Sequence, residues 1–251
     1  MHVVRSEPEL RGNGARMAGI RAARHETVAP LDDDDTWEAT KLRAQLDALE
    51  SAGVSGGNWV VSCAILEKDL STGGERVVPT EPVRDVPSIT EYLLERPRLR
   101  SVSPQFASST MLFPQALALS EPWDTAVRLH QDWEWLIWLE RERGTRMLCV
   151  PEPLVCRPVS HADSLTTDPN WRASLEWGKR YLTATSRRIR GDFFLTLPAD
   201  RAGRAASGSG LLACLGAALR GGRLGYGAWA YFCVTTFRAL SNRVRMGRPA
   251  A

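Results

Sequence analysis

The sequence contains few of the residues that stabilise small secreted domains or build zinc sites. Among its 251 residues there are only five cysteines and four histidines. The cysteines are odd in number, form no CxxC pair and stand beside no histidine at zinc-ligand spacing. These absences exclude a disulfide framework and a structural zinc site, and they indicate a reducing compartment.

Long apolar segments are also absent. The opening residues, MHVVRSEPELRGNG, include no apolar h-region, so we expect no secretory signal. The two apolar stretches near the C-terminus, LLACLGAAL and LGYGAWAYFCVTTF, are each too short to span a bilayer. We therefore expect a cytoplasmic protein.

Acidic residues are scarce towards the C-terminal end. From Leu182 onward, eleven arginines stand against Asp192 and Asp200, a local balance of +9, whereas the whole chain carries only +3. A basic tail on an acidic body indicates contact with an anionic surface. We expect peripheral contact with the inner face of the cell membrane and no nucleic acid partner. The alternative is a general preference for arginine over lysine, with the two apolar stretches packed as ordinary core helices.

Several segments have clear structural patterns. Residues 58–66, NWVVSCAIL, predict a buried strand. Residues 132–144, DWEWLIWLERERG, predict a helix that is apolar almost all round and therefore largely buried. Residues 198–210, PADRAGRAASGSG, predict a flexible basic linker, and residues 211–251 a basic, apolar helical tail.

The stretch APLDDDDTW places four carboxylates side by side, directly before an amphipathic helix. Leu42 and Leu46 are expected on the apolar stripe of that helix, and Asp35 or Thr36 at its N-terminal cap. Asp32 and Asp34, two residues apart, can direct oxygens toward one point, which suits Mg²⁺ or Mn²⁺. The alternative is a solvated acidic loop in which Asp35 merely caps the helix.

The surroundings of this acidic run resemble the family 2 glycosyltransferases, which are inverting enzymes of the GT-A type. The stretch GARMAGIRAARHETVAPLDDDDTWEATKLRAQL is similar to the one around that family's metal-binding DXD motif. The positions in register are Ala15, Arg16, Gly19, Ile20, Leu31, Asp32, Asp34, Asp35, Trp37, Lys41, Leu42 and Gln45. The resemblance implies that Arg16, Asp32 and Asp33 bind a nucleotide-diphospho-sugar and that Asp32 and Asp34 hold the metal.

A second stretch, SSTMLFPQALALSEPWDTAVRLHQDWEWLIWLERERG, is similar to the family's segment around its catalytic base. Asp132 stands at the base position, and Gln131 replaces the glutamate that usually precedes it. The resemblance implies that Asp132 takes the proton from the acceptor hydroxyl during attack on the anomeric carbon. Asp132 also fits the N-cap of the following helix.

A third, shorter similarity lies in VPEPLVCRPVSHADSLT. It implies that His161 lies near the diphosphate or the metal. The alternative for a lone histidine is a structural role.

The family's fold opens with two strands that precede the DXD motif, and no run like VSVIIPTYN or IVVDDGS occurs here. Only thirty-one residues precede Asp32, whereas two βα units need about 60. The fold expected from the resemblance is therefore a truncated GT-A domain over residues 1–197. It has a mixed sheet flanked by helices, followed by the linker and the helical tail.

Three functions follow from these patterns. The first is metal-assisted, inverting sugar transfer to a saccharide, lipid-linked or protein acceptor, as in the synthesis of cell-envelope polysaccharide. The second is a non-catalytic remnant of such an enzyme, since the opening strands are missing. The third is a haloacid-dehalogenase-like phosphatase, because DDDDT also satisfies DxDxT, with Asp32 as nucleophile and Asp34 as acid and base.

Overall fold

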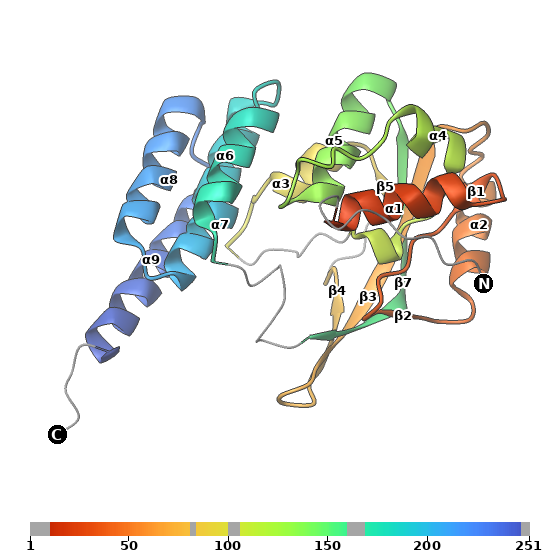
Figure 1. The fold of residues 1–251 in the computed structure, drawn as a ribbon. Coiled ribbons are helices and arrows are strands. Elements are labelled where there is room, and N and C mark those ends of the chain that lie inside the picture. The colour runs from red at the N-terminus through yellow and green to blue at the C-terminus, as the bar shows by residue number, and fades with distance from the viewer. Residues whose placement is uncertain (1–10, 81–83, 100–105, 160–168, 247–251) are drawn as a thin grey trace. The chain divides into compact units, whose positions relative to one another are not determined.

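The chain forms two compact units in the computed structural model (Figure 1). The described residues are 11–80, 84–99, 106–159 and 169–246. The N-terminal unit comprises residues 1–93 and 102–160, and the C-terminal unit residues 94–101 and 161–251. None of the described helices combines the length and the apolar character needed to cross a bilayer.

A mixed sheet forms the centre of the N-terminal unit. Its two long strands, β3 (Trp59–Asp69) and β7 (Arg146–Val159), run parallel, with Trp59 opposite Arg146. The strands β2 (Thr36–Trp37), β4 (Glu75–Val78) and β5 (Asp85–Val86) pair antiparallel at their sides. The order is β2-β7-β3-β4, with β5 also on β7. The apolar run of β3 is buried on both faces, as expected for a central parallel strand.

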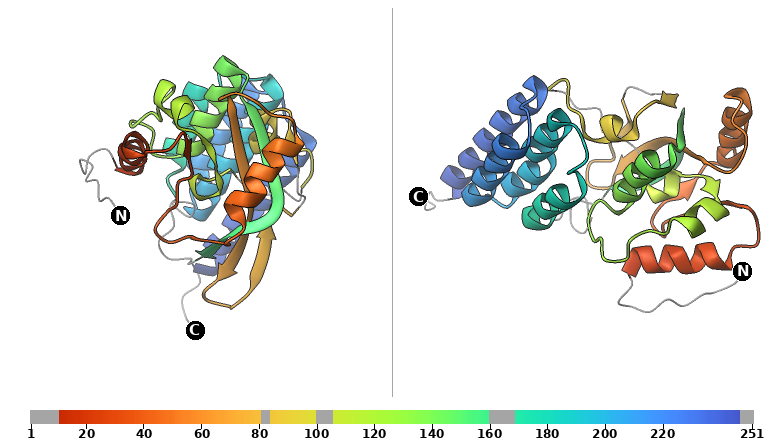
Figure 2. Two further views of the ribbon diagram at one scale, coloured as in Figure 1. Left: turned by 90° about the vertical axis from the view of Figure 1, so that its right-hand side faces the viewer. Right: turned by 90° about the horizontal axis from the view of Figure 1, so that it is seen from above.

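Helices cover this sheet (Figure 2). They are α1 (Arg11–Ala22), α2 (Lys41–Ser51), α3 (Ile89–Leu94), α4 (Gln115–Ser120) and α5 (Gln131–Arg143). A second, two-stranded sheet pairs β1 (Thr27–Val28) with β6 (Phe113–Pro114). The short 3-10 turn η2 (Ser108–Thr110) lies against β3 and β7 and is fully buried. The predicted α/β class with a mixed sheet is therefore confirmed.

Helix α2 is amphipathic, but its buried stripe is not the predicted one. It begins at Lys41, so Asp35 and Thr36 do not cap it. Its buried positions include Lys41 and Gln45, whereas Leu42 and Leu46 are exposed. The apolar pattern therefore misplaced the inner face of the helix.

Hydrogen bonds explain why two polar side chains of α2 face inward. The Lys41 Nζ donates to Gln45 Oε1 at 2.9 Å and lies 4.2 Å from the centre of the Trp37 ring. Burial lowers the pKa of Lys41 to about 8. Gln45 Nε2 in turn donates to the carbonyl oxygens of Val61, at 3.0 Å, and Thr110, at 2.8 Å. The helix thus ties β3 to the turn η2.

The C-terminal unit is built around helix α7 (Arg187–Arg204), which packs against three others. They are α6 (Trp171–Tyr181), α8 (Gly208–Gly221) and α9 (Tyr226–Met246). Trp177 and Phe193 contact each other in the core, with ring centroids 5.3 Å apart. Gly178 permits this approach, because a Cβ there would lie 2.3 Å from Phe193.

The predicted linker at residues 198–210 is wrong. Helix α7 runs through Arg204, and α8 begins only four residues later at Gly208. Most of the segment is helical because its alanines and leucines pack in the unit's core, although its composition is that of a linker. The units divide elsewhere, between residues 93 and 94 and between residues 160 and 161. The helical character predicted for the tail agrees with α8 and α9.

Candidate functional site

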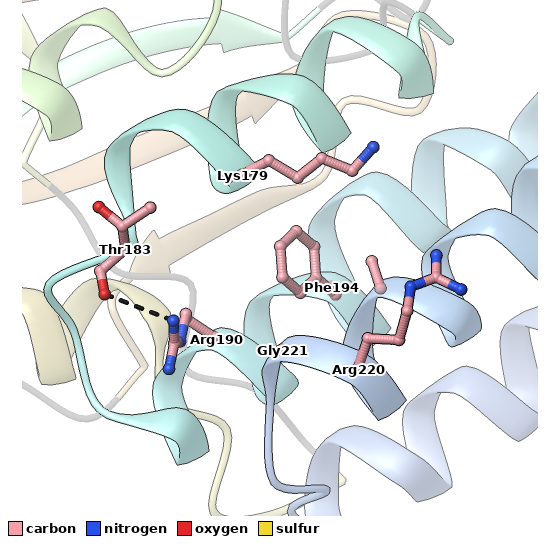
Figure 3. A pocket seen from close by; sticks show the side chains of 8 residues that line it. Lys179, Thr183, Arg190, Phe194, Arg220 and Gly221 are labelled. Atoms are coloured by element: carbon pink, nitrogen blue, oxygen red, sulfur yellow. Dashed lines mark hydrogen bonds between the residues drawn. The ribbon is translucent and has the colours of Figure 1, made fainter.

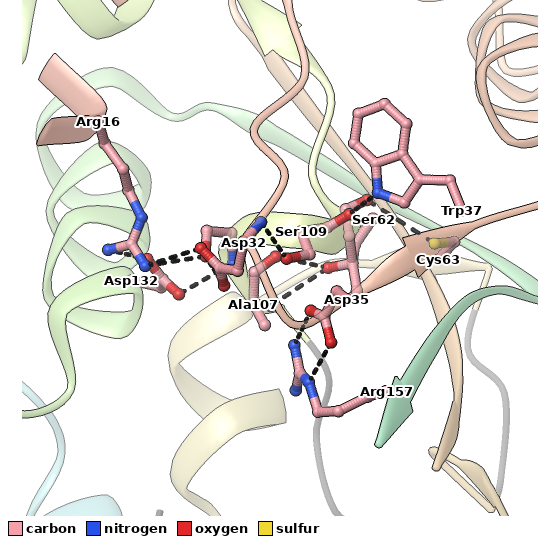
Figure 4. Close-up of polar contacts among 12 residues, drawn as sticks. Arg16, Asp32, Asp35, Trp37, Ser62, Cys63, Ala107, Ser109, Asp132 and Arg157 are labelled. Atoms are coloured by element: carbon pink, nitrogen blue, oxygen red, sulfur yellow. Dashed lines mark hydrogen bonds and ion pairs between the residues drawn. The ribbon is translucent and has the colours of Figure 1, made fainter. Parts of the chain in front are cut away.

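The four aspartates form a turn that separates their side chains. The backbone N–H of Asp35 donates to the carbonyl of Asp32 at 3.3 Å, and Asp33 and Asp34 lie at the tip. Asp33 and Asp34 are exposed, Asp32 is half-buried and Asp35 is buried. The charges are therefore not packed together: two face solvent, and two meet arginines on different sides of the turn (Figure 4).

On one side of the turn, Arg16 joins the two carboxylates singled out from the sequence. Its Nη2 lies 3.3 Å from Asp32 Oδ1, and its Nη1 lies 3.7 Å from Asp132 Oδ1. Arg16 comes from α1, Asp32 from the turn and Asp132 from the first turn of α5. Three segments separated along the chain thus meet at one guanidinium.

Ser108, which the sequence analysis did not single out, connects the same groups. Its backbone N–H donates to Asp132 Oδ2 at 2.9 Å, and its hydroxyl donates to Asp32 Oδ2 at 2.8 Å. The hydroxyl oxygen also accepts from Arg16 Nη2 at 3.0 Å. The stretch SSTMLF looked like a strand, and its only local signal was the pair of serines. In the structure these residues form η2, which we define together with Arg16, Asp32 and Asp132 as the arginine–carboxylate cluster.

The two carboxyl groups of this cluster have different electrostatics. Burial alone would raise the pKa of Asp32, but the Ser108 hydrogen bond and the Arg16 charge outweigh it and lower that pKa. Burial raises the pKa of Asp132, and neither Arg16 nor the Ser108 N–H fully offsets it. Asp32 is therefore a stable anion, whereas Asp132 binds a proton more readily than a free aspartate.

Two polar atoms of the cluster have no hydrogen-bond partner among the described residues. They are Asp132 Oδ1 and Arg16 Nε, and both are buried. Buried polar atoms without partners are rare in native proteins and mark sites that a ligand completes. Gln131, which stands where the family has glutamate, accepts from Arg16 Nη1 at 3.1 Å. Its neutral side chain does not add a second negative charge beside Asp132.

On the other side of the turn, Asp35 forms a two-point ion pair with Arg157 of β7. Arg157 Nε lies 3.0 Å from Asp35 Oδ1, and Nη2 lies 2.8 Å from Oδ2. The Asp35 side chain is fully buried, and that of Arg157 is 25% exposed. This fork geometry is the strong form of such a pair. Asp35 therefore anchors the turn to the sheet.

Not every predicted site residue joins the cluster. Asp33 and Asp34 stand beside it on the exposed tip of the turn, and no described residue pairs with either. His161 lies outside the described residues. Asp132 is not an N-cap, because α5 begins at Gln131 with His130 as its cap residue.

The acidic turn meets some requirements of a divalent cation site. Asp32 and Asp34 supply only oxygen atoms, and Asp34 is open to solvent. The described residues contain no group of three or more His, Cys, Asp or Glu side chains suited to a metal. Mg²⁺ in enzymes commonly takes one or two carboxylates and completes its shell with water and substrate phosphates. The donor set fits that arrangement, and it does not fit a cage made by protein groups alone.

The phosphatase alternative finds no support in this geometry. It requires a strongly apolar strand directly before the aspartates. The preceding strand, β1, has two residues and pairs with β6 outside the main sheet. Both oxygens of Asp32, its nucleophile, are engaged by Arg16 and Ser108.

A separate pocket of ≈ 250 Å³ lies in the C-terminal unit (Figure 3). Three basic side chains, Lys179, Arg190 and Arg220, line it together with Phe194. Arg190 Nη1 donates to the Thr183 carbonyl at 3.4 Å. None of the residues predicted from the sequence to act in catalysis or binding lines this pocket.

Comparison with known proteins agrees with the resemblance seen around the acidic run. Residues 1–82 match the family model described as Glycosyl transferase family 2. The N-terminal part of the chain is therefore a glycosyl transferase family 2 domain.

A particular relative is the amylovoran biosynthesis glycosyltransferase AmsB of Erwinia amylovora. It is 27% identical to this chain over 154 residues, which cover 61% of this chain and 49% of AmsB. The chain thus spans about half the length of this curated relative.

Two solved structures of S. aureus TarS are also similar, each with 11% sequence identity. The first gives a TM-score of 0.47 and covers 91% of this chain and 41% of TarS. The second, TarS 1–349 in complex with UDP, gives a TM-score of 0.49 and covers 99% of this chain and 75% of that one.

Proposed function

We propose that the chain transfers a sugar from a nucleotide-diphospho-sugar to an acceptor hydroxyl with inversion at the anomeric carbon. The observation that carries this proposal is the arginine–carboxylate cluster. Its members come from two stretches that resemble the family at two different functions, donor binding and base catalysis. They meet although 115 positions separate Arg16 from Gln131 beside the base.

Asp132 is the proposed base. It removes the proton of the acceptor hydroxyl while that oxygen bonds to the anomeric carbon and the bond to the diphosphate breaks. Its raised pKa suits proton uptake, and its unpartnered Oδ1 leaves one oxygen for the acceptor proton. Ser108 and Arg16 hold the carboxylate in place through its other oxygen and through charge.

The proposed donor site is the acidic turn. Asp32, fixed as an anion by Ser108 and Arg16, and Asp34 would hold Mg²⁺ or Mn²⁺. Such an ion neutralises negative charge on the leaving diphosphate. Asp33 and His161 are proposed donor contacts on the strength of the family resemblance.

The acceptor class follows less directly. AmsB is named for the biosynthesis of amylovoran, and we propose an envelope-polysaccharide role for this chain as well. The acceptor is then a saccharide, lipid-linked or protein hydroxyl. A cytoplasmic location would supply both the nucleotide-sugar and the reducing conditions that the cysteine usage indicates.

A panel of UDP- and GDP-sugars tests the proposal without knowledge of the acceptor, since water serves as a poor acceptor. We expect Mn²⁺-dependent release of nucleoside diphosphate from one donor. Proton NMR of the first-formed sugar should show the opposite anomer from the donor. A first-formed sugar with the donor's own configuration would contradict inversion, and equal release in EDTA would contradict the metal's role.

A further inference from the structure

The last described helix, α9, has two apolar faces, and the fold uses only one. The inner face carries the buried residues Phe232, Thr235 and Ala239 and packs against α7. The contact is close: a Cβ added to Gly203 of α7 would lie 2.6 Å from Thr235 Cγ2. The helix is therefore held in its unit without help from the opposite face.

The opposite face is a continuous apolar stripe that is exposed along the described part of the helix. We name it the outer stripe; its residues are Tyr226, Trp229, Cys233, Phe237 and Leu240. Steps of three and four residues place them on one side of a helix. Tyr226 is 85% and Phe237 72% exposed. Apolar surface gathered in this way marks an interaction site.

The charge around the outer stripe is of one sign. Beyond Asp200 the sequence has eight arginines and no acidic residue. Arg223 and Arg238, one just before α9 and one within it, are exposed. The acidic residues of α7, Asp192 and Asp200, are each already paired with an arginine of the same helix. The surface that meets the outer stripe must therefore be anionic.

From these observations we infer that the outer stripe binds an anionic lipid bilayer, with α9 lying in the plane of the membrane interface. Tyrosine and tryptophan favour the headgroup level, phenylalanine and leucine insert below it, and arginines contact anionic headgroups. A second copy of this chain fits poorly, because it would bring an equally basic tail to the contact. This inference does not depend on the proposed sugar transfer.

Co-sedimentation with vesicles tests the inference on the full chain. We expect binding to vesicles of phosphatidylcholine mixed with phosphatidylglycerol, weak binding to phosphatidylcholine alone, and release at high salt. The double variant Trp229→Ser/Phe237→Ser should lower the partition coefficient at least ~tenfold. Arg238→Gln should lower it about fivefold.

Leu70→Ser is the matched control, because Leu70 is also an exposed apolar residue, 68% accessible, but lies in the N-terminal unit. It should bind vesicles as the unaltered chain does. All the altered side chains are exposed, and circular dichroism should give the same melting temperature for each variant.

Cys233 offers a direct readout from the middle of the outer stripe. It is the exposed cysteine; Cys63, Cys149 and Cys214 are buried, and Cys156, half-buried, is replaced by serine. An environment-sensitive fluorophore on Cys233 should shift to the blue with anionic vesicles and be quenched by spin-labelled lipids. No binding to anionic vesicles, or a fluorophore that stays in water, would overturn the inference. So would a stable dimer that the Trp229/Phe237 double variant breaks, since that assigns the outer stripe to a second copy.

Discussion

Replacing Asp132 by asparagine is expected to lower the rate of sugar transfer by about a thousandfold while leaving donor binding unchanged. The amide keeps an oxygen for the Ser108 N–H, which now donates to the Asp132 carboxylate at 2.9 Å. It removes the proton acceptor and nothing else. The fold should not suffer, because a neutral side chain replaces a carboxylate whose charged form burial disfavours.

The pH profile distinguishes a base from a structural residue at this position. A base must be deprotonated, so activity should rise with pH through the pKa of Asp132. Burial raises that pKa, so the acid limb should lie above that of a free aspartate. Transfer by Asp132→Asn, measured by nucleoside diphosphate release, should lose this limb. Equal activity of the variant, or loss of donor affinity together with rate, would assign Asp132 to another role.

Arg157→Gln is expected to destabilise the N-terminal unit by about 3 kcal/mol. The change leaves Asp35, whose side chain is fully buried, without the two-point ion pair that compensates it. Urea denaturation followed by circular dichroism measures the loss. Adding Asp35→Asn to Arg157→Gln should restore much of it, because the uncompensated charge is then gone.

Arg146→Gln is the matched control. Arg146 lies on the same strand, β7, and its Nη2 is 2.8 Å from Asp85, but both side chains are at least half exposed. Surface pairs contribute about 0–1 kcal/mol. If Arg157→Gln cost no more than Arg146→Gln, the pair would not anchor the acidic turn.

The residues of the candidate cluster were largely accessible from the sequence, because each sits in a stretch with a recognisable pattern. Arg16, Asp32 and Asp132 were named before any coordinates and lie within one network. Ser108 was not, because its contribution is a backbone N–H and a hydroxyl placed by the η2 turn. No residue type or spacing reports where a backbone N–H points.

The strong apolar segments were predicted well, and the marginal ones were not. The run NWVVSCAIL forms β3, and the nearly all-apolar segment after Asp132 forms α5. In α2, however, tertiary hydrogen bonds draw Lys41 and Gln45 inward and leave Leu42 exposed. In the same way, packing against α8 and α9 keeps α7 helical through a segment whose composition resembles a linker. Both errors arise where contacts distant in sequence override local preference.

The most direct test of the central claim is calorimetric titration of the chain with UDP and GDP, with and without Mn²⁺. The account predicts metal-dependent binding of one nucleotide that Asp34→Ala abolishes. Asp47→Ala, which removes an exposed aspartate from α2, should bind like the unaltered chain. Absence of binding by a chain that circular dichroism shows to be folded would contradict the account and favour a non-catalytic protein.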